Sequence, residues 1–332
     1  MAVDASNALL CWYVVDKRRL PWRPAPGERP DPYRVWLSEV MLQQTTVAHA
    51  APYFEKFAAR WPTVADLAAA EDGDVMAAWA GLGYYARARN LLACARKVES
   101  EMGGHFPSEE AELRKLPGIG DYTAAAVAAI AFGRHAVAVD SNVERITARL
   151  FAVDDRLPVA RPKLRALAAT LVPEDRAGDF TQAIMELGQT VCTPRNPDCG
   201  RCPLTPCCSA FAAGNPGRYP VKAAKRARPE RSGTAYWLEH DGHVLLRRRP
   251  EKGLLGGMLA LPEAAPAEAD WSEGGAVHHV FTHFALRMSL LCAEAEDRPH
   301  GIWWPVDRIV EAGLPTLFAK LAERGREWRQ AA

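Results

Sequence analysis

The sequence predicts a two-domain chain: a mainly α-helical N-terminal region, residues 1–215, and a C-terminal α+β domain, residues 233–332, joined by a basic linker, residues 216–232. Between about residues 30 and 190, apolar residues recur at three- and four-residue intervals, which is the helical period. In the C-terminal third, apolar residues alternate with polar ones, which indicates strands. A chain of 332 residues is also long for a single hydrophobic core.

The charge balance and the N-terminus limit the class of protein. The chain carries 41 basic and 40 acidic residues, so any surface that binds nucleic acid must be a local patch. The N-terminus lacks a basic segment followed by an apolar core, and no stretch approaches the roughly 18 apolar residues of a membrane span. We therefore expect an intracellular protein without membrane contact, in which the isolated thiols of Cys11, Cys94 and Cys292 are buried and free.

Four cysteines near the middle of the chain form the most specific pattern. Six, two and five residues separate successive members of the set Cys192, Cys199, Cys202 and Cys208. Four thiolates bind an iron–sulfur cluster, whereas structural zinc sites usually have two close pairs of ligands. The spacing favours a [4Fe–4S] cluster, with zinc and unligated cysteines as the alternatives. Because Cys207 is adjacent to Cys208, the choice of Cys208 as the fourth ligand rests on spacing alone.

A glycine-rich turn, LPGIGDYTA at residues 116–124, has the helix-hairpin-helix pattern. Gly118 and Gly120 permit a tight turn that brings backbone N–H groups close to a phosphate, at the N-terminus of the following helix. The pattern indicates DNA binding, although an ordinary connection between two helices has the same composition. Asp140 opens another helix about twenty residues later, a position that usually belongs to an N-cap residue.

The order of these features resembles the endonuclease III superfamily of base-excision DNA glycosylases. Four segments are similar to its adenine DNA glycosylase (MutY) family: LPWR at 20–23, SEVMLQQT at 38–45, GLGYYAR at 81–87 and MELG at 185–188. The resemblance extends over nearly all of residues 8–210. It implies a monomeric, bacterial, cytoplasmic and nucleoid-associated enzyme that acts on double-stranded DNA with adenine opposite 8-oxoguanine or guanine.

The resemblance assigns the chemistry to four residues. Glu39 would protonate the departing adenine at N7, and Asp140 would stabilise the positive charge that develops on the sugar. Tyr122 and Asn142 would orient these carboxylates and the water. Tyrosine replaces the lysine of the bifunctional lyases at position 122, so no Schiff base can form there. Without the resemblance, Glu39 on a solvated helix face is the alternative.

The same resemblance assigns the binding residues. Leu20, Trp22, Arg23 and Gln182 would line the adenine pocket. A base must leave the stack before it can react, so other residues enter or hold the duplex. By position these are Gln44, Thr45, Leu82, Tyr84, Arg87, Gly118 and Gly120. Ser141 departs from the family pattern, which has glycine there, but serine also suits a helix start.

The C-terminal domain resembles a Nudix fold more weakly. Residues 234–249 predict two strands around an Asp-Gly turn, residues 278–294 predict another strand, and residues 314–325 predict a closing helix. No Glu-rich segment that could hold Mg²⁺ follows Gly257, so we expect no pyrophosphatase activity. In the family this domain contacts 8-oxoguanine, and the residues that match its recognition loop are Phe281, Thr282 and His283.

Two other functions fit parts of the pattern. A bifunctional glycosylase and AP lyase needs a reactive lysine, and Lys115 lies close to the hairpin. A non-catalytic iron–sulfur module that binds DNA would need the four cysteines and the hairpin but not Glu39. In the favoured interpretation the cluster is structural and positions a basic loop that contains Arg195 and Arg201 against the DNA backbone.

Overall fold

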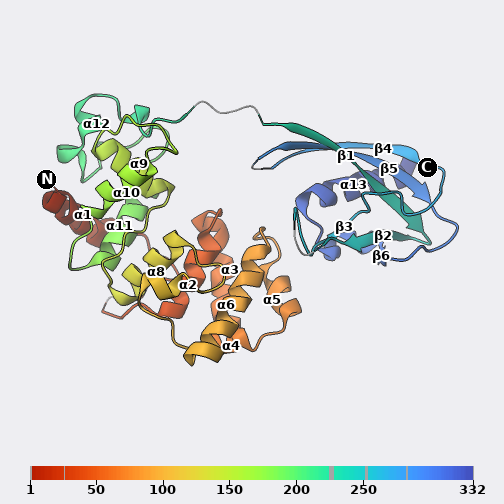
Figure 1. Ribbon diagram of the computed structural model, residues 1–332, viewed down its shortest axis with the longest axis horizontal. Helices are drawn as coiled ribbons and strands as arrows, with labels where there is room; N and C mark the ends of the chain where they lie inside the picture. Colours follow the sequence, from red (N-terminus) through yellow and green to blue (C-terminus); the bar gives the residue numbers. More distant parts are fainter. Residues whose placement is uncertain (1, 26, 224–227, 251–252, 282, 332) are drawn as a thin grey trace. The chain divides into compact units, whose positions relative to one another are not determined.

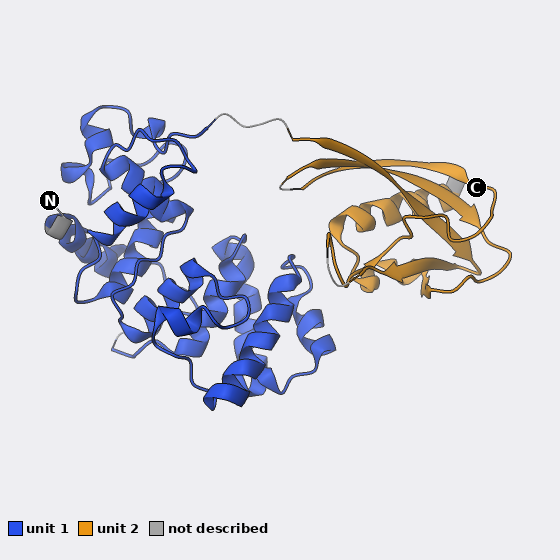
Figure 2. Cartoon of the chain, viewed as in Figure 1, with its two compact units in different colours: residues 1–224 blue, residues 225–332 orange. Residues whose placement is uncertain are grey.

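The chain folds into two compact units, residues 1–224 and residues 225–332 (Figure 2). The mainly helical first unit and the α+β second unit confirm the predicted fold class. No helix in the described part of the chain is long and apolar enough to cross a membrane. The structure is a computed structural model, and it describes residues 2–25, 27–223, 228–250, 253–281 and 283–331.

Helices of the first unit form two groups (Figure 1). One group, α2 to α8, surrounds a large apolar core, and the other, α1 with α9 to α12, surrounds separate clusters. Helix α8 contacts both α2 and α11 and so joins the two groups. The bounds are α1 Ala2–Asp16, α2 Pro32–Leu42, α3 Val47–Arg60, α4 Val64–Ala68, α5 Asp72–Trp79, α6 Ala86–Met102, α7 Glu110–Leu113, α8 Asp121–Phe132, α9 Ser141–Leu150, α10 Arg161–Ala169, α11 Ala177–Thr190, η1 Thr205–Cys207, α12 Ser209–Ala212 and η2 Pro216–Arg218.

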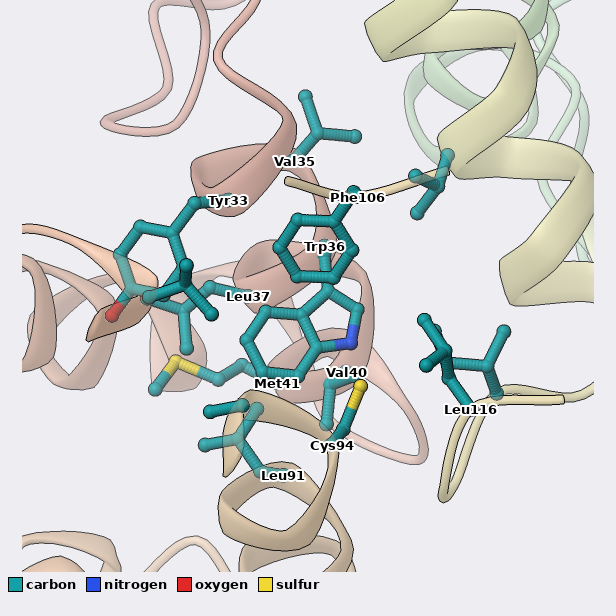
Figure 3. Packing of buried hydrophobic residues seen from close by; sticks show 14 of the residues in the cluster. Tyr33, Val35, Trp36, Leu37, Val40, Met41, Leu91, Cys94, Phe106 and Leu116 are labelled. Carbon is teal, nitrogen blue, oxygen red and sulfur yellow. The ribbon is translucent and has the colours of Figure 1, made fainter. Parts of the chain in front are cut away.

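Helix α2 lies inside the first core. Asp31 caps its N-terminus by accepting a hydrogen bond of 2.9 Å from the Tyr33 N–H. Every residue from Val35 to Met41 is buried, so this part of the helix has no solvated face. The Trp36 and Phe106 rings pack with their centroids 5.1 Å apart (Figure 3). A carboxyl group on this helix is therefore buried among apolar side chains.

The described residues of the second unit form a six-stranded sheet that packs against α13. The strand order is β3-β2-β1-β5-β4, and β6 pairs with β2. Strands β1 and β5 are parallel, whereas the other pairs are antiparallel. The bounds are β1 Glu230–His240, β2 His243–Arg248, β3 Leu259–Ala260, β4 Ser272–Val280, β5 Ala285–Glu294, β6 Ile302–Pro305, η3 Val306–Ala312 and α13 Thr316–Ala331.

The predicted turn and closing helix of this unit are confirmed, but one predicted strand is wrong. Asp241 and Gly242 have φ values of 45° and 69° between β1 and β2, as a two-residue hairpin turn of type I′ requires. Residues 278–294 contain not one strand but the end of β4 and all of β5. The chain reverses between them because the Phe281 N–H donates to the Phe284 carbonyl at 2.8 Å. Between β3 and β4, the described residues contain no helix.

The segment expected to be a linker, residues 216–232, is partly regular. Pro216–Arg218 forms η2, Lys222 makes a β-bridge with Leu157, and β1 begins at Glu230. The first part of the segment is ordered because Tyr219 and Val221 pack in an apolar cluster of the first unit, which composition does not reveal.

Of the three isolated cysteines, Cys94 and Cys292 are buried as predicted. Cys11 is exposed, which corrects the prediction. Leu9, Leu10 and Tyr13 of α1 enter the core, and Cys11 lies on the other side of the helix.

Candidate active site

A pocket opens in the first unit between the segment before α2, helix α2 and helix α11. It encloses about 540 Å³ of space, part of it open to solvent. Leu20, Trp22, Arg23 and Gln182, the four residues predicted to line a pocket, do line it. Glu39 lines the same pocket, so segments distant in the sequence surround this carboxyl group.

Glu39 is the buried acid of the pocket, with 7% of its surface exposed. The pKa of its carboxyl group is raised to about 7: burial is the main cause, a hydrogen bond with Tyr122 opposes the shift, and the charge of Asp140 adds to it. A carboxyl group with such a pKa can hold a proton near neutral pH and release it. The solvated helix face considered from the sequence is therefore excluded.

Tyr122, on α8, contacts Glu39 and is affected by the charge of Asp140. Its hydroxyl hydrogen-bonds with Glu39 and also lies 3.4 Å from the Met185 sulfur. The pKa of this hydroxyl is raised well above its usual value, first by burial and then by the charges of Glu39 and Asp140. Asp140 does not itself line the pocket. Its electrostatic effect on Glu39 and Tyr122 nevertheless requires that the three side chains lie close together.

Asp140 is the N-cap residue of α9, as the sequence indicated. One carboxylate oxygen accepts hydrogen bonds of 2.8 Å from the backbone N–H groups of Asn142 and Val143. The other oxygen accepts a bond of 2.6 Å from the Asn142 side chain. The same geometry that begins the helix therefore fixes the orientation of the carboxylate.

Asn142 is held in turn by residues that the sequence analysis did not select. Arg145 donates to the Asn142 side-chain oxygen at 2.8 Å and to the Gly188 carbonyl at 2.7 Å. A Cβ atom at Gly188 would lie 2.6 Å from the Asn142 Cβ, so only glycine fits there. Gly188 ends the MELG segment, which was the available sequence signal.

Glu186 was also missed, although it belongs to the same MELG segment. It is almost fully buried in the pocket wall, where Arg23 contacts it at 2.8 Å and Arg18 forms a second ion pair. Burial opposes ionisation, but the hydrogen bonds from Arg18 and Arg23 lower the pKa of Glu186 below its usual value. Two carboxyl groups of one pocket therefore differ in protonation near neutral pH, because only Glu186 has arginine partners.

Two short loops carry the exposed residues that were predicted to enter DNA. Tyr84 has 62% of its surface exposed, and Gln44 is exposed as well. Both have positive φ values, 49° and 59° respectively, which are uncommon for residues other than glycine. Thr45, next to Gln44, is partly exposed.

Leu82 and Arg87 were also predicted to contact DNA, and in the structure both side chains are directed into the protein. Leu82 is 4% exposed and belongs to the apolar core. The terminal nitrogens of Arg87 donate to four backbone carbonyls of the protein, so they are not free to bind a phosphate. Sequence position did not reveal that Leu82, in the loop, and Arg87, at the start of α6, point inward while Tyr84 between them points outward.

The predicted hairpin lies between α7 and α8. Gly118 has a φ of 74°, and a Cβ atom there would lie 2.7 Å from Asn90, so the turn requires glycine. Gly120 is the N-cap residue of α8, with open space around the position of a Cβ atom. Lys115, the lysine considered for a lyase, pairs with Glu112 at 2.7 Å and is largely exposed.

The four predicted cysteine ligands line a second pocket of about 290 Å³, part of it open to solvent. Cys207 does not line it, and its sulfur lies 3.3 Å from the Leu204 carbonyl oxygen instead. In the described residues, no group of three or more His, Cys, Asp or Glu side chains is arranged to hold a metal ion. The members of the set share this pocket: Cys192, Cys199, Cys202 and Cys208.

Arg149 is a fully buried cation in the wall of the cysteine pocket. It donates to the Cys192 sulfur at 3.2 Å and to backbone carbonyls, among them Thr193 at 2.8 Å and Tyr219 at 3.2 Å. No carboxylate among the described residues forms an ion pair with it. Because a buried cation needs compensating negative charge, anionic sulfur in this pocket suits the surroundings of Arg149.

In the second unit, Phe281 packs against His279 and Phe284, with ring centroids 4.5 and 4.8 Å away. His283 is exposed at the turn between β4 and β5. Thr282 lies outside the described residues. The predicted recognition segment therefore has an aromatic base and an exposed imidazole.

Comparison with known proteins identifies the family. Residues 37–173 match the model described as HhH-GPD superfamily base excision DNA repair protein, and residues 233–324 match the NUDIX domain. The adenine DNA glycosylase of Buchnera aphidicola subsp. Schizaphis graminum is 30% identical over 342 residues, which cover 96% of this chain and 97% of that protein. This chain belongs to the adenine DNA glycosylase family. The predicted resemblance is thereby confirmed.

Other relatives agree with this assignment to the adenine DNA glycosylase family. The human adenine DNA glycosylase is 39% identical over 308 residues, which cover 77% of this chain and 56% of the human protein. The chain therefore spans only part of the length of that relative. A solved thermostable thymine-DNA glycosylase is 31% identical with a TM-score of 0.57, and the match covers 63% of this chain and 95% of that structure.

Proposed function

We propose that this protein removes adenine paired with 8-oxoguanine, and also with guanine, by hydrolysis of the N-glycosidic bond without lyase action. The proposal rests mainly on one observation: Glu39, whose pKa is raised to about 7, lies in the pocket and is coupled to Tyr122 and Asp140. Its substrate is double-stranded DNA, bound by one copy of the chain in the bacterial cytoplasm. The helical unit performs the chemistry, and the Nudix-like unit reads the oxidised base.

In this mechanism Glu39 donates a proton to adenine N7, and the electrons of the breaking C1′–N9 bond move onto the base. Positive charge develops on the sugar, and the Asp140 carboxylate stabilises it. Water then adds at C1′, and its proton returns to Glu39. The products are free adenine and an abasic site, and Tyr122 and Asn142 keep the two carboxyl groups in place.

The remaining predicted residues have roles in recognition. Leu20, Trp22, Arg23 and Gln182 surround the extruded adenine, an assignment that their place in the pocket wall supports. Gln44, Thr45 and Tyr84 occupy the duplex, since at least Gln44 and Tyr84 are exposed. The hairpin around Gly118 and Gly120 holds the phosphate backbone. In the second unit, 8-oxoguanine is read by Phe281, Thr282 and His283.

A single-turnover assay tests the proposed activity on duplexes with adenine opposite 8-oxoguanine, guanine or thymine. We expect rapid adenine release opposite 8-oxoguanine, slower release opposite guanine and little opposite thymine. Release from none of them would contradict the proposal. Borohydride trapping on abasic DNA distinguishes a lyase from a glycosylase without lyase action, because only a Schiff base is captured. We expect no trapped complex, since no lysine lines the pocket in the described residues.

We further propose that Cys192, Cys199, Cys202 and Cys208 hold a [4Fe–4S] cluster that stabilises the fold. Each cysteine would bind a different iron, so the four sulfurs need a wider arrangement than one metal ion requires. Their shared pocket and the buried cation of Arg149 support this cofactor.

Adjacent cysteines provide a matched test of the cluster. Cys208→Ser removes a proposed ligand, whereas Cys207→Ser changes a thiol outside the pocket. We expect the Cys208 variant to lose iron and visible absorbance and the Cys207 variant to keep both. Zinc in the native protein, or equal iron in both variants, would refute the assignment.

A further inference from the structure

Arg87 donates hydrogen bonds to two parts of the first unit: the end of α2, the helix of Glu39, and the loop that carries Tyr84. Its Nη1 atom donates to the carbonyls of Val40 and Met41, both at 3.0 Å. Its Nη2 atom donates to the carbonyls of Leu82 and Gly83, at 3.1 and 3.3 Å. The first pair lies at the end of α2, directly after Glu39, and the second pair directly precedes Tyr84.

The end of α2 has a physical need for such a cation. A helix leaves its last carbonyls without intrahelical partners, and α2 ends at Leu42. The Nη1 group of the planar guanidinium donates to two carbonyls at this end, and its positive charge is favourable at a helix C-terminus. Four residues beyond Val40 lies Gln44, with its positive φ of 59°.

The second loop also depends on its surroundings. Tyr84 has a positive φ of 49°, and strained backbone of this kind persists only where neighbouring contacts fix it. The Gly83 carbonyl accepts from Arg87 and, at 3.0 Å, from the Trp79 indole N–H. The guanidinium also packs between two rings, 5.2 Å from the Trp79 centroid and 5.6 Å from the Tyr84 centroid.

We infer that Arg87 is a positioning residue that sets Tyr84 and Gln44 in a fixed relation to Glu39, a role that rests on the proposed function. It contacts neither substrate nor the reacting atoms. Through its four carbonyl bonds, the residues that open the duplex and the acid that protonates adenine share one rigid support. Extrusion of the base would then place N7 within reach of the proton donor.

Arg96 offers a matched control on the same helix, α6. Its guanidinium also donates to backbone carbonyls, those of Ala68 at 3.2 Å and Ala70 at 3.0 Å, but these lie outside the pocket. Arg96→Met therefore removes two bonds to carbonyls, and an ion pair with Asp72 at 2.8 Å, without touching the Tyr84 loop. Arg87→Lys keeps the charge but loses the planar fork, and it serves if Arg87→Met does not fold.

Hydrogen exchange in the full-length protein tests the connection independently of activity. In Arg87→Met or Arg87→Lys, amide exchange should accelerate in both residues 43–46 and residues 81–85. Arg96→Met should accelerate exchange only near residues 68–72. Unchanged exchange in either of the first two segments would overturn the inference. If exchange responds as expected but the wild-type protein releases no adenine, the proposed function is wrong and the connection stands.

A double-mutant cycle tests whether Arg87 acts through Tyr84. We expect Arg87→Met to reduce single-turnover adenine release by about 10²-fold, the size of effect that a misplacement of about 1 Å can cause. Tyr84→Ala should also reduce it, and the double variant should lose little more than Arg87→Met alone. If Arg87 had a purely structural role, the double variant would lose activity by the product of the two single losses, and the melting temperature would fall in parallel. That result would overturn the inference. Arg96→Met should leave the rate unchanged.

Discussion

Two carboxyl groups of the first unit lie close together but in opposite environments. Glu39 is on a helix whose neighbouring residues are all buried, and its pKa is raised to about 7. Asp140 begins a helix and accepts three hydrogen bonds from N–H groups. The apolar surroundings of Glu39 favour its protonated form, whereas hydrogen bonds fix the orientation of Asp140, and this contrast suits the different tasks proposed for the two carboxyl groups. Three experiments test whether the two carboxyl groups differ in this way.

The largest effect is expected for Glu39→Gln, which keeps the shape of the side chain but cannot donate an acidic proton. Single-turnover adenine release should fall by about 10² to 10⁴-fold, the usual contribution of a general acid. DNA binding and cluster content should remain. Release at the wild-type rate would mean that Glu39 is a buried structural residue, and loss of binding would indicate a packing role.

Two substitutions separate the structural role of Asp140, which caps α9, from its proposed chemical role. Asn is as good an N-cap as Asp, so Asp140→Asn should keep the melting temperature, whereas Asp140→Ala should lose about 1 kcal/mol of stability. Both should reduce adenine release by about 10² to 10³-fold through loss of the negative charge. If Asp140→Asn remains active, Asp140 is a helix cap only.

The smallest effect concerns the pH dependence. Glu39 must be protonated to act, so release should be constant below pH 7 and fall about tenfold per pH unit above it, following its pKa of about 7. The Tyr122 hydrogen bond lowers this pKa, so Tyr122→Phe should raise it and extend the active range to higher pH. Single-turnover rates measured across pH check this shift.

Tyr33→Phe is the matched control for the pH experiment. It removes another buried hydroxyl, one that donates to the Trp61 carbonyl at 2.8 Å, outside the pocket. Its profile should match the wild type. A profile that moves to lower pH in Tyr122→Phe would contradict the assigned direction of the hydrogen bond.

The sequence was most informative where function depends on local spacing. Helical periodicity, the Asp-Gly turn and the N-cap position of Asp140 are all local, so they could be predicted. The choice of Cys208 over Cys207 also agreed with the pocket. Predictions were less successful for residues 278–294, because an alternating pattern continues through a tight turn as readily as along one strand.

Which groups meet in the active site was decided by the tertiary structure. Glu39, Tyr122 and Asp140 belong to three different elements, and their coupling arises only when α2, α8 and α9 pack together. The ion pairs of Glu186, the buried Leu82 and the inward guanidinium of Arg87 depend on the same packing. The sequence alone was enough to predict the fold class of each unit and the family, and it selected the cysteine set that we propose as ligands. Burial, and with it the protonation of each carboxyl group, follows from contacts between distant segments, because desolvation is a property of the surroundings and not of the residue.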